Sequence, residues 1–68
     1  MKLIMRTEFD NLRKNSQHEY ETDKNGDKQV VKIYCHKQLI AKKVTLKKSI
    51  RYFAVAGYQQ FLIDEVDE

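Results

Sequence analysis

The 68-residue chain has no proline, no tryptophan, two glycines and a single cysteine. The one cysteine, Cys35, cannot form a disulfide within the chain, whereas small secreted domains of this length usually rely on several. We therefore expect a protein of a reducing compartment and assign it to the cytoplasm. The two separate glycines, Gly26 and Gly57, exclude a glycine-rich loop that could hold a phosphate.

Long hydrophobic runs are also absent. Three consecutive apolar residues precede Arg6, too few for the core of a signal peptide, and no later run approaches the roughly 18 residues of a membrane span. We therefore expect no membrane contact. With 41% hydrophobic and 34% charged residues, the chain has too many apolar side chains for a disordered tail, and its length suits one small globular domain over residues 1–68.

Catalytic groups are few and poorly placed. The nucleophiles are Cys35, Ser16 and Ser49, and the bases are His18 and His36. Neighbouring residues of a strand point to opposite faces, so Cys35 and His36 cannot form a dyad there, and Cys35 suits a small core position. The Cys and His residues together fall short of the four ligands of a structural zinc site. We expect no enzymatic activity, no cofactor and no metal.

Charge is segregated along the chain. Residues 1–27 carry five basic and six acidic side chains, residues 28–51 carry eight basic and no acidic ones, and residues 52–68 carry four acidic ones alone. Such a middle block creates a positive potential that attracts phosphate groups or an acidic protein surface. The simpler explanation is that surface lysines keep strands soluble and discourage edge-to-edge pairing.

Alternating apolar and polar residues predict the strands. Residues 2–9 alternate as a half-buried strand does, and residues 10–17 predict a loop or one helical turn. Asn25-Gly26 is a pair favoured in two-residue hairpin turns. A turn there sets three pairs of opposite charge face to face: Lys24 with Asp27, Asp23 with Lys28, and Glu19 with Lys32. The same register assigns these residues to the core face: His18, Tyr20, Thr22, Val31, Ile33 and Cys35.

Residues 33–46 predict a second hairpin, because two apolar runs flank a short polar step. Regular alternation would then place Ile40, Val44 and Leu46 on the core face, with Lys42 among them. We expect His18 at the edge of the core and His36 in an exposed turn.

Residues 46–63 allow two predictions. Their apolar residues fit an amphipathic helix, but basic residues at its start and acidic ones at its end would oppose the helix dipole. A hairpin that turns at Gly57-Tyr58 instead opposes Arg51 to Asp64, and both its faces are apolar. Such a hairpin needs cover on both sides, and a homodimer through residues 50–63 is one way to provide it.

These patterns favour a mainly β fold, a small antiparallel sheet or barrel of five to six short strands. The alternative is an α+β fold, in which an antiparallel sheet is joined by one C-terminal helix at about residues 46–63. Both fold classes are common among small domains and neither carries a binding site by itself.

The cations of the middle block define the candidate binding site. Once Lys28 and Lys32 are paired with acids of the first hairpin, six cations lack a predicted partner: Lys37, Lys42, Lys43, Lys47, Lys48 and Arg51. Tyr34 beside them could stack on bases. Lysine outnumbers arginine, which favours electrostatic attraction over bidentate reading of bases. We predict a non-enzymatic protein that binds a polyanion, nucleic acid first, through this basic face at residues 37–51.

The alternative is a small protein-binding regulator or inhibitor that occludes a partner with an acidic surface. Strand addition at an exposed sheet edge would serve that purpose. A further hypothesis concerns the acidic residues 64–68, which would mask Lys47, Lys48 and Arg51 if they folded over them.

Overall fold

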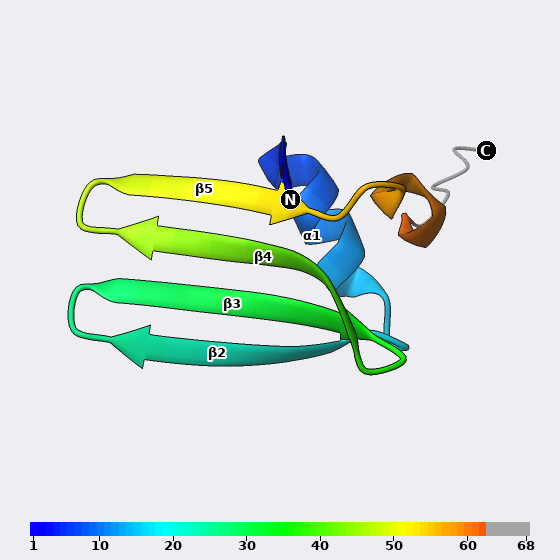
Figure 1. Cartoon of the computed structure of the whole chain (residues 1–68), viewed down its shortest axis with the longest axis horizontal. Coiled ribbons are helices and arrows are strands. Elements are labelled where there is room, and N and C mark those ends of the chain that lie inside the picture. The colour runs from blue at the N-terminus through cyan, green and yellow to red at the C-terminus, as the bar shows by residue number, and fades with distance from the viewer. Residues whose placement is uncertain (63–68) are drawn as a thin grey trace.

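The computed structural model describes residues 1–62. Its elements are β1 (Lys2–Ile4), α1 (Arg6–Lys14), β2 (Glu19–Asn25), β3 (Lys28–Cys35), β4 (Gln38–Leu46), β5 (Ser49–Ala54) and the 3-10 turn η1 (Tyr58–Phe61). The strands form one open antiparallel sheet in the order β1-β5-β4-β3-β2 (Figure 1). The mainly β prediction is therefore confirmed. The alternative C-terminal helix is wrong, because residues 46–54 belong to the hairpin of β4 and β5.

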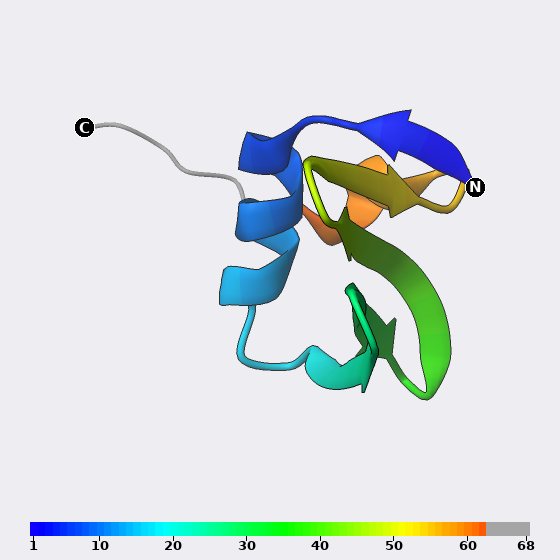
Figure 2. The same cartoon turned by 90° about the vertical axis from the view of Figure 1, so that its left-hand side faces the viewer.

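Helix α1 lies across one face of the sheet (Figure 2). It begins after Met5, whose carbonyl accepts hydrogen bonds from the amides of Glu8 and Phe9, both at 3.1 Å. The Glu8 carboxylate in turn accepts a hydrogen bond from the Met5 amide at 3.1 Å, which satisfies a donor that the helix leaves open. The predicted strand over residues 2–9 is therefore wrong beyond Ile4, since its apparent alternation continues into the helical spacing of Phe9 and Leu12.

The core lies between α1 and the end of the sheet that the helix crosses. Its buried residues are Ile4, Phe9, Leu12, Ile33, Ile40, Ala41, Ala54 and Tyr58. We call this part of the sheet the covered end. The opposite ends of the two long hairpins, residues 24–30 and 44–50, form the uncovered end and contain no buried residue. Stability is therefore concentrated where α1 packs, because burial of apolar side chains is the main favourable contribution to folding.

The first hairpin exists, but its register differs from the predicted one. The turn residues are Gly26 and Asp27, and of these two only Gly26 has a positive φ, 61°, so glycine takes the first central position as in type II′ turns. Asn25 therefore faces Lys28, and Glu21 rather than Glu19 faces Lys32. Each partner has moved by two residues. Because side chains alternate with a period of two, the predicted assignment of residues to the two faces is kept.

The second hairpin turns at His36 and Lys37, both with positive φ, and this prediction is confirmed. The pairing of β3 with β4 contains a bulge, since Ile33 faces Ala41 while Tyr34 faces Leu39. Ile40 is the extra residue, and it is buried together with Ala41. Ile40 lies on the core face as expected, but the placement of Lys42, Val44 and Leu46 there is wrong: the bulge reverses the alternation, and their side chains point away from α1.

The third hairpin turns at Lys47 and Lys48, ten residues before the turn predicted at Gly57-Tyr58. Gly57 instead has a φ of 80° and precedes η1. The predicted hairpin over residues 50–63 is therefore wrong. The homodimer stays a prediction, but the two-sided apolar hairpin from which it was argued is not formed. The partner assigned to Arg51, Asp64, lies outside the described residues.

A hydrogen bond from Tyr58 to Glu8 fastens η1 to the start of α1. The Tyr58 hydroxyl donates to the Glu8 carboxylate, and this bond is the main reason why the pKa of Glu8 is lowered from its usual 4.5. The same bond raises the pKa of Tyr58 above its usual 10.0. The bond is therefore strongest with an ionised Glu8 and a neutral Tyr58.

Candidate functional site

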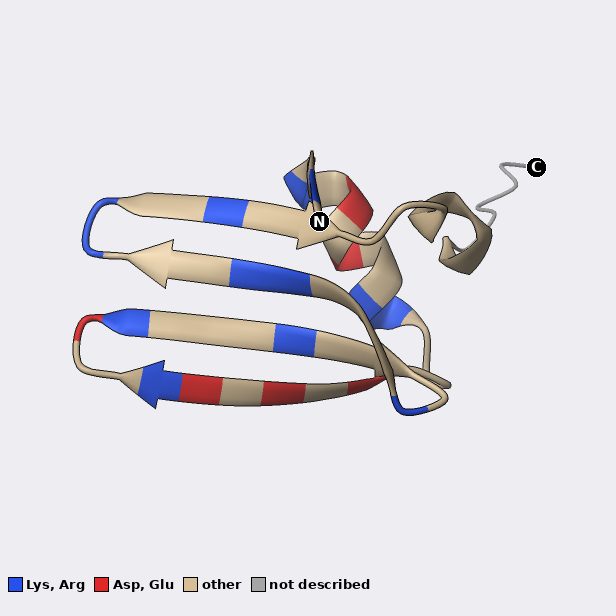
Figure 3. Cartoon of the chain, in the orientation of Figure 1, with Lys and Arg blue, Asp and Glu red and all other residues tan. Residues whose placement is uncertain are grey.

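Charge is divided across the sheet by strand (Figure 3). Strand β2 at one edge carries the acidic residues Glu19, Glu21 and Asp23, whereas β3, β4 and β5 carry cations and no acidic residue. The segregation that the sequence shows along the chain thus becomes a separation in space. A ligand that is negatively charged is attracted to β4 and β5 and repelled from the β2 edge.

The predicted site residues do not form one cluster. We call the side of the sheet opposite α1 the open face. Strand alternation and the register place on it these side chains of β1, β3, β4 and β5: Leu3, Val30, Lys32, Tyr34, Leu39, Lys42, Val44, Leu46, Arg51 and Phe53. At the β2 edge of the same face lie the acids Glu19, Glu21 and Asp23. Of the predicted site, Lys42, Arg51 and Tyr34 therefore share this face. Lys47 and Lys48 lie at the adjoining hairpin turn of the uncovered end.

Two predicted residues lie apart from this group. Lys37 occupies the turn between β3 and β4, at the opposite end of β4 from Lys47 and Lys48. Lys43 points to the helix side of the sheet, where its ammonium lies 5.9 Å from the centre of the Tyr52 ring. Neither is positioned to contact a ligand that lies on the open face.

The most unusual feature of the open face is a pair of like charges. Lys32 on β3 faces Lys42 on β4 directly across the ladder, at a spacing of about 5 Å between Cβ atoms, where like charges destabilise a sheet. On its other side Lys32 faces Glu21 of β2, and it forms a partly exposed ion pair with Asp23 at 3.8 Å, so its own charge is partly balanced. Lys42 forms no salt bridge with any residue of the described chain.

Phe53 completes this part of the open face. It lies directly across from Lys42 on one side and Leu3 on the other, and the Lys42 ammonium lies 5.6 Å from the centre of its ring. Phe53 is half-buried, so part of the ring remains accessible to a ligand. Tyr34, the aromatic residue that the sequence favoured, faces Glu19 of the acidic strand instead.

The turns of the uncovered end bring further cations together. Lys47 pairs with Asp27 of the neighbouring turn at 3.7 Å, but both side chains are more than 70% exposed, so the pair contributes little. Lys28 faces Asn25 rather than an acid and returns to the set of available cations. The sequence-based register excluded Lys28 because it placed the turn one residue too early; the glycine rather than the asparagine occupies the first central position. Lys32 keeps acidic neighbours in the observed register, since it faces Glu21 and pairs with Asp23.

Cys35 and His18, considered above as a possible nucleophile and base, pack at the core. Cys35 is half-buried against the core cluster, as expected. The His18 ring donates from Nδ1 to the Leu12 carbonyl at 2.9 Å and meets the edge of Phe61, so its predicted place at the core edge is confirmed. Within residues 1–62 no group of three or more His, Cys, Asp and Glu side chains could hold a metal ion. The acidic residues 64–68 of the masking hypothesis lie outside the described chain.

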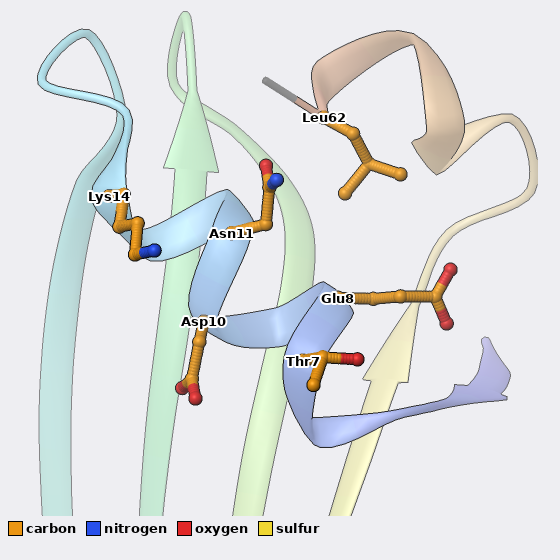
Figure 4. A pocket seen from close by; sticks show the side chains of 6 residues that line it. All are labelled: Thr7, Glu8, Asp10, Asn11, Lys14 and Leu62. Atoms are coloured by element: carbon orange, nitrogen blue, oxygen red, sulfur yellow. The ribbon is translucent and has the colours of Figure 1, made fainter. Parts of the chain in front are cut away.

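A hollow on the outer side of α1 has a different character (Figure 4). It is lined by Thr7, Glu8, Asp10, Asn11, Lys14 and Leu62. The side chains around it carry both signs of charge, and none belongs to the basic block.

No helix within residues 1–62 combines the length and apolar character needed to span a membrane.

Comparison with known proteins found no matching family model, no matching curated protein and no matching solved structure.

Proposed function

We propose that this chain is a non-enzymatic binding protein whose ligand is a nucleic acid, held on the β4 and β5 side of the open face and at the adjoining turn. The observation that carries the proposal is the direct apposition of Lys32 and Lys42. A sheet gains nothing from such a pair, because it repels within the molecule. An external phosphate between the two ammonium groups turns that repulsion into attraction.

The distribution of charge defines a path for the ligand. The acids of β2 repel phosphates, so the sugar-phosphate backbone of the nucleic acid runs over β4 and β5, from Lys42 past Arg51 to Lys47 and Lys48 (Figure 3). The nine residues of β4 extend over about 30 Å, which suits a polymer with regularly spaced charges better than a single small anion. Because the cations are mostly lysines, they contact phosphates as point charges and do not read base edges.

Phe53 favours a single-stranded ligand. An aromatic ring among cations on an open sheet can stack on an unpaired base, a contact that tolerates any sequence. Leu3 and Val44 extend the apolar surface around this ring.

The test is a binding titration with a fluorescently labelled, mixed-sequence single-stranded oligonucleotide, followed by anisotropy from low to physiological salt. We expect affinity that falls steeply with salt, and a slope of log K against log salt that is reduced by about 1 in Lys42→Gln. Lys37→Gln removes the same charge at the other end of β4 and is the matched control, with an unchanged slope.

Two results would contradict the proposal. The first is an absence of binding at low salt, which would favour the alternative of a regulator or inhibitor that occludes a partner protein. The second is an equal loss in the Lys42 and Lys37 variants, because affinity would then follow net charge and no particular surface would be involved. Circular dichroism of each variant checks that the fold is retained.

A further inference from the structure

The outer edge of β5 is left partly unpaired. Strand β1 pairs only with Tyr52–Ala54, because the chain leaves the sheet at Met5 to enter α1. Within the described chain, no strand adjoins the outer side of Ser49–Arg51. A strand edge of this kind presents free backbone donors and acceptors that another chain can use.

The two edges of the sheet are protected to different extents. All seven residues of β2 are exposed, and the charges at alternate positions, Glu19, Glu21 and Asp23, discourage pairing of its outer edge with another strand. The free segment of β5 instead has the apolar Ile50 at its centre, and 53% of this residue is exposed. The β5 edge is thus the less protected of the two.

A hollow lies at the point where β1 ends. It is lined by Leu3, Ile4, Ile50, Arg51 and Tyr52, so it continues the line of β1 beside the free part of β5. Leu3 is 64% exposed. Exposed apolar side chains that gather at an unpaired edge mark an interaction site more often than isolated ones do.

We propose that Ser49–Arg51 accept an extended segment of a partner protein as an additional strand, antiparallel to β5 and in line with β1. The side chain opposite Ile50 would lie on the helix side beside Ile4 and is therefore apolar. The side chains opposite Ser49 and Arg51 would lie on the open face, between Arg51 and Lys48, and are therefore acidic. The edge thus selects an acidic, apolar, acidic sequence, with main-chain hydrogen bonds supplying affinity and the pockets supplying specificity.

Charge argues against a second copy of the chain as the occupant. Pairing two β5 edges would bring Lys47, Lys48 and Arg51 of both copies together, and β5 carries no acid to balance them; Asp27 forms only an exposed pair with Lys47. An acidic peptide meets the same cations with opposite charge. We therefore assign the edge to a different protein.

The test uses a labelled synthetic heptapeptide of alternating glutamate and valine. Its control is the same peptide with an N-methyl group on the amide of the central valine that pairs with β5, which removes a donor and keeps charge and composition. We expect binding by anisotropy, and a loss of about tenfold on N-methylation, the size expected from one or two backbone hydrogen bonds. Amide NMR shifts should appear at Ile4 and Ser49–Arg51 and be absent along β2.

Protein variants separate this proposal from nucleic-acid binding. Ile50→Lys replaces the apolar side chain at the edge by a charged one and should abolish peptide binding while leaving oligonucleotide binding equal or stronger. Lys42→Gln should lower the salt slope of oligonucleotide binding by about 1 and leave peptide binding unchanged. Ile50 is exposed, so the fold should survive, and the N-methyl comparison needs no protein variant. Three outcomes would overturn the strand proposal: equal affinity for both peptides, shifts along β2, or self-association of the chain through β5 without peptide binding.

Discussion

The covered and uncovered ends of the sheet differ in what they bury and in what they carry. At the covered end α1 packs against β4 and β5 and encloses every buried residue of the described chain. At the uncovered end the two long hairpins extend beyond the helix with both faces open to solvent (Figures 1 and 2). The cations Lys28, Lys47 and Lys48 lie there, and Lys42 lies between the two ends.

This difference separates the requirements of folding from those of binding. A domain of this size has little stability to lose, because its core is small relative to its surface. The lysines of the uncovered turns lie away from the residues that hold the fold together, whereas the pair Lys32 and Lys42 adjoins the buried residues Ile33 and Ala41. Four substitutions test this division, from the largest expected effect to the smallest.

Leu12→Ala should have the largest effect. Leu12 is fully buried between α1 and the sheet, and removing its side chain should cost about 2–5 kcal/mol of unfolding free energy. Urea denaturation followed by circular dichroism measures this loss, and in so small a domain it should leave much of the chain unfolded. A midpoint close to that of the unchanged protein would show that the covered end is not the source of stability.

Gly26→Ala should have a smaller effect, confined to the uncovered end. Nothing lies within 4 Å of a Cβ at this position, so the cost comes from the left-handed backbone alone, about 1–2 kcal/mol. Gly26→Asn is the control, because asparagine tolerates this conformation and should cost less. A loss as large as that of Leu12→Ala would mean that the uncovered end folds as one unit with the core.

Tyr58→Phe tests the fastening of η1 to α1 at the covered end. Since the pKa of Glu8 is lowered on folding, its stabilising contribution is present at neutral pH and is lost as the pH falls through the folded-state value, below 4.5. Since the pKa of Tyr58 is raised, its contribution is lost as the pH rises through the folded-state value, above 10.0. The difference in Tm between the two proteins should therefore be greatest at neutral pH and shrink on both sides. A pH-independent difference would contradict this role of the bond.

Lys42→Gln should have the smallest effect on stability, and in the unusual direction. Removing it relieves the repulsion with Lys32, worth a few tenths of a kcal/mol, and this offsets the lost contact with the Phe53 ring. We expect an unfolding free energy at low salt that is unchanged or slightly raised. A loss above about 1 kcal/mol would identify Lys42 as a structural residue and weaken its assignment to a binding surface.

The alternation of apolar and polar residues predicted which face of the sheet a residue lies on better than it predicted which residues pair across strands. A pattern of period two assigns Ile33 and Cys35 to the core face whichever residues form the turn. The exact partners depend on the φ values of the turn, and Asn25-Gly26 allows more than one solution. The bulge at Ile40 could not be predicted from the sequence, because the extra residue is set by packing against α1 and leaves no local signal.

The candidate site was predicted in part for a related reason. Closeness in sequence grouped Lys37 with Lys47 and Lys48, but β4 separates the turns at its two ends by its whole length. Neighbouring strand residues point to opposite faces, and the bulge decided that Lys42 lies on the open face and Lys43 on the helix side. The basic block of the sequence stays together in the structure, because β3, β4 and β5 are neighbours in the sheet as well as in the chain. The helical turn offered for residues 10–17 agrees with the second half of α1, but the start of the helix at Arg6 was missed because its N-cap, Met5, is not among the residue types that mark a helix start.

The pairing of β1 with β5 has a consequence for folding during synthesis. β1 precedes its partner strand by some fifty residues, and closing so long a loop costs more entropy than closing any of the three successive hairpins, so this pairing should form last. We expect β2 to β5 to pair before β1 does, so that the whole outer edge of β5 is unpaired for a time. Once β1 has paired with Tyr52–Ala54, only Ser49–Arg51 keep an unpaired outer edge.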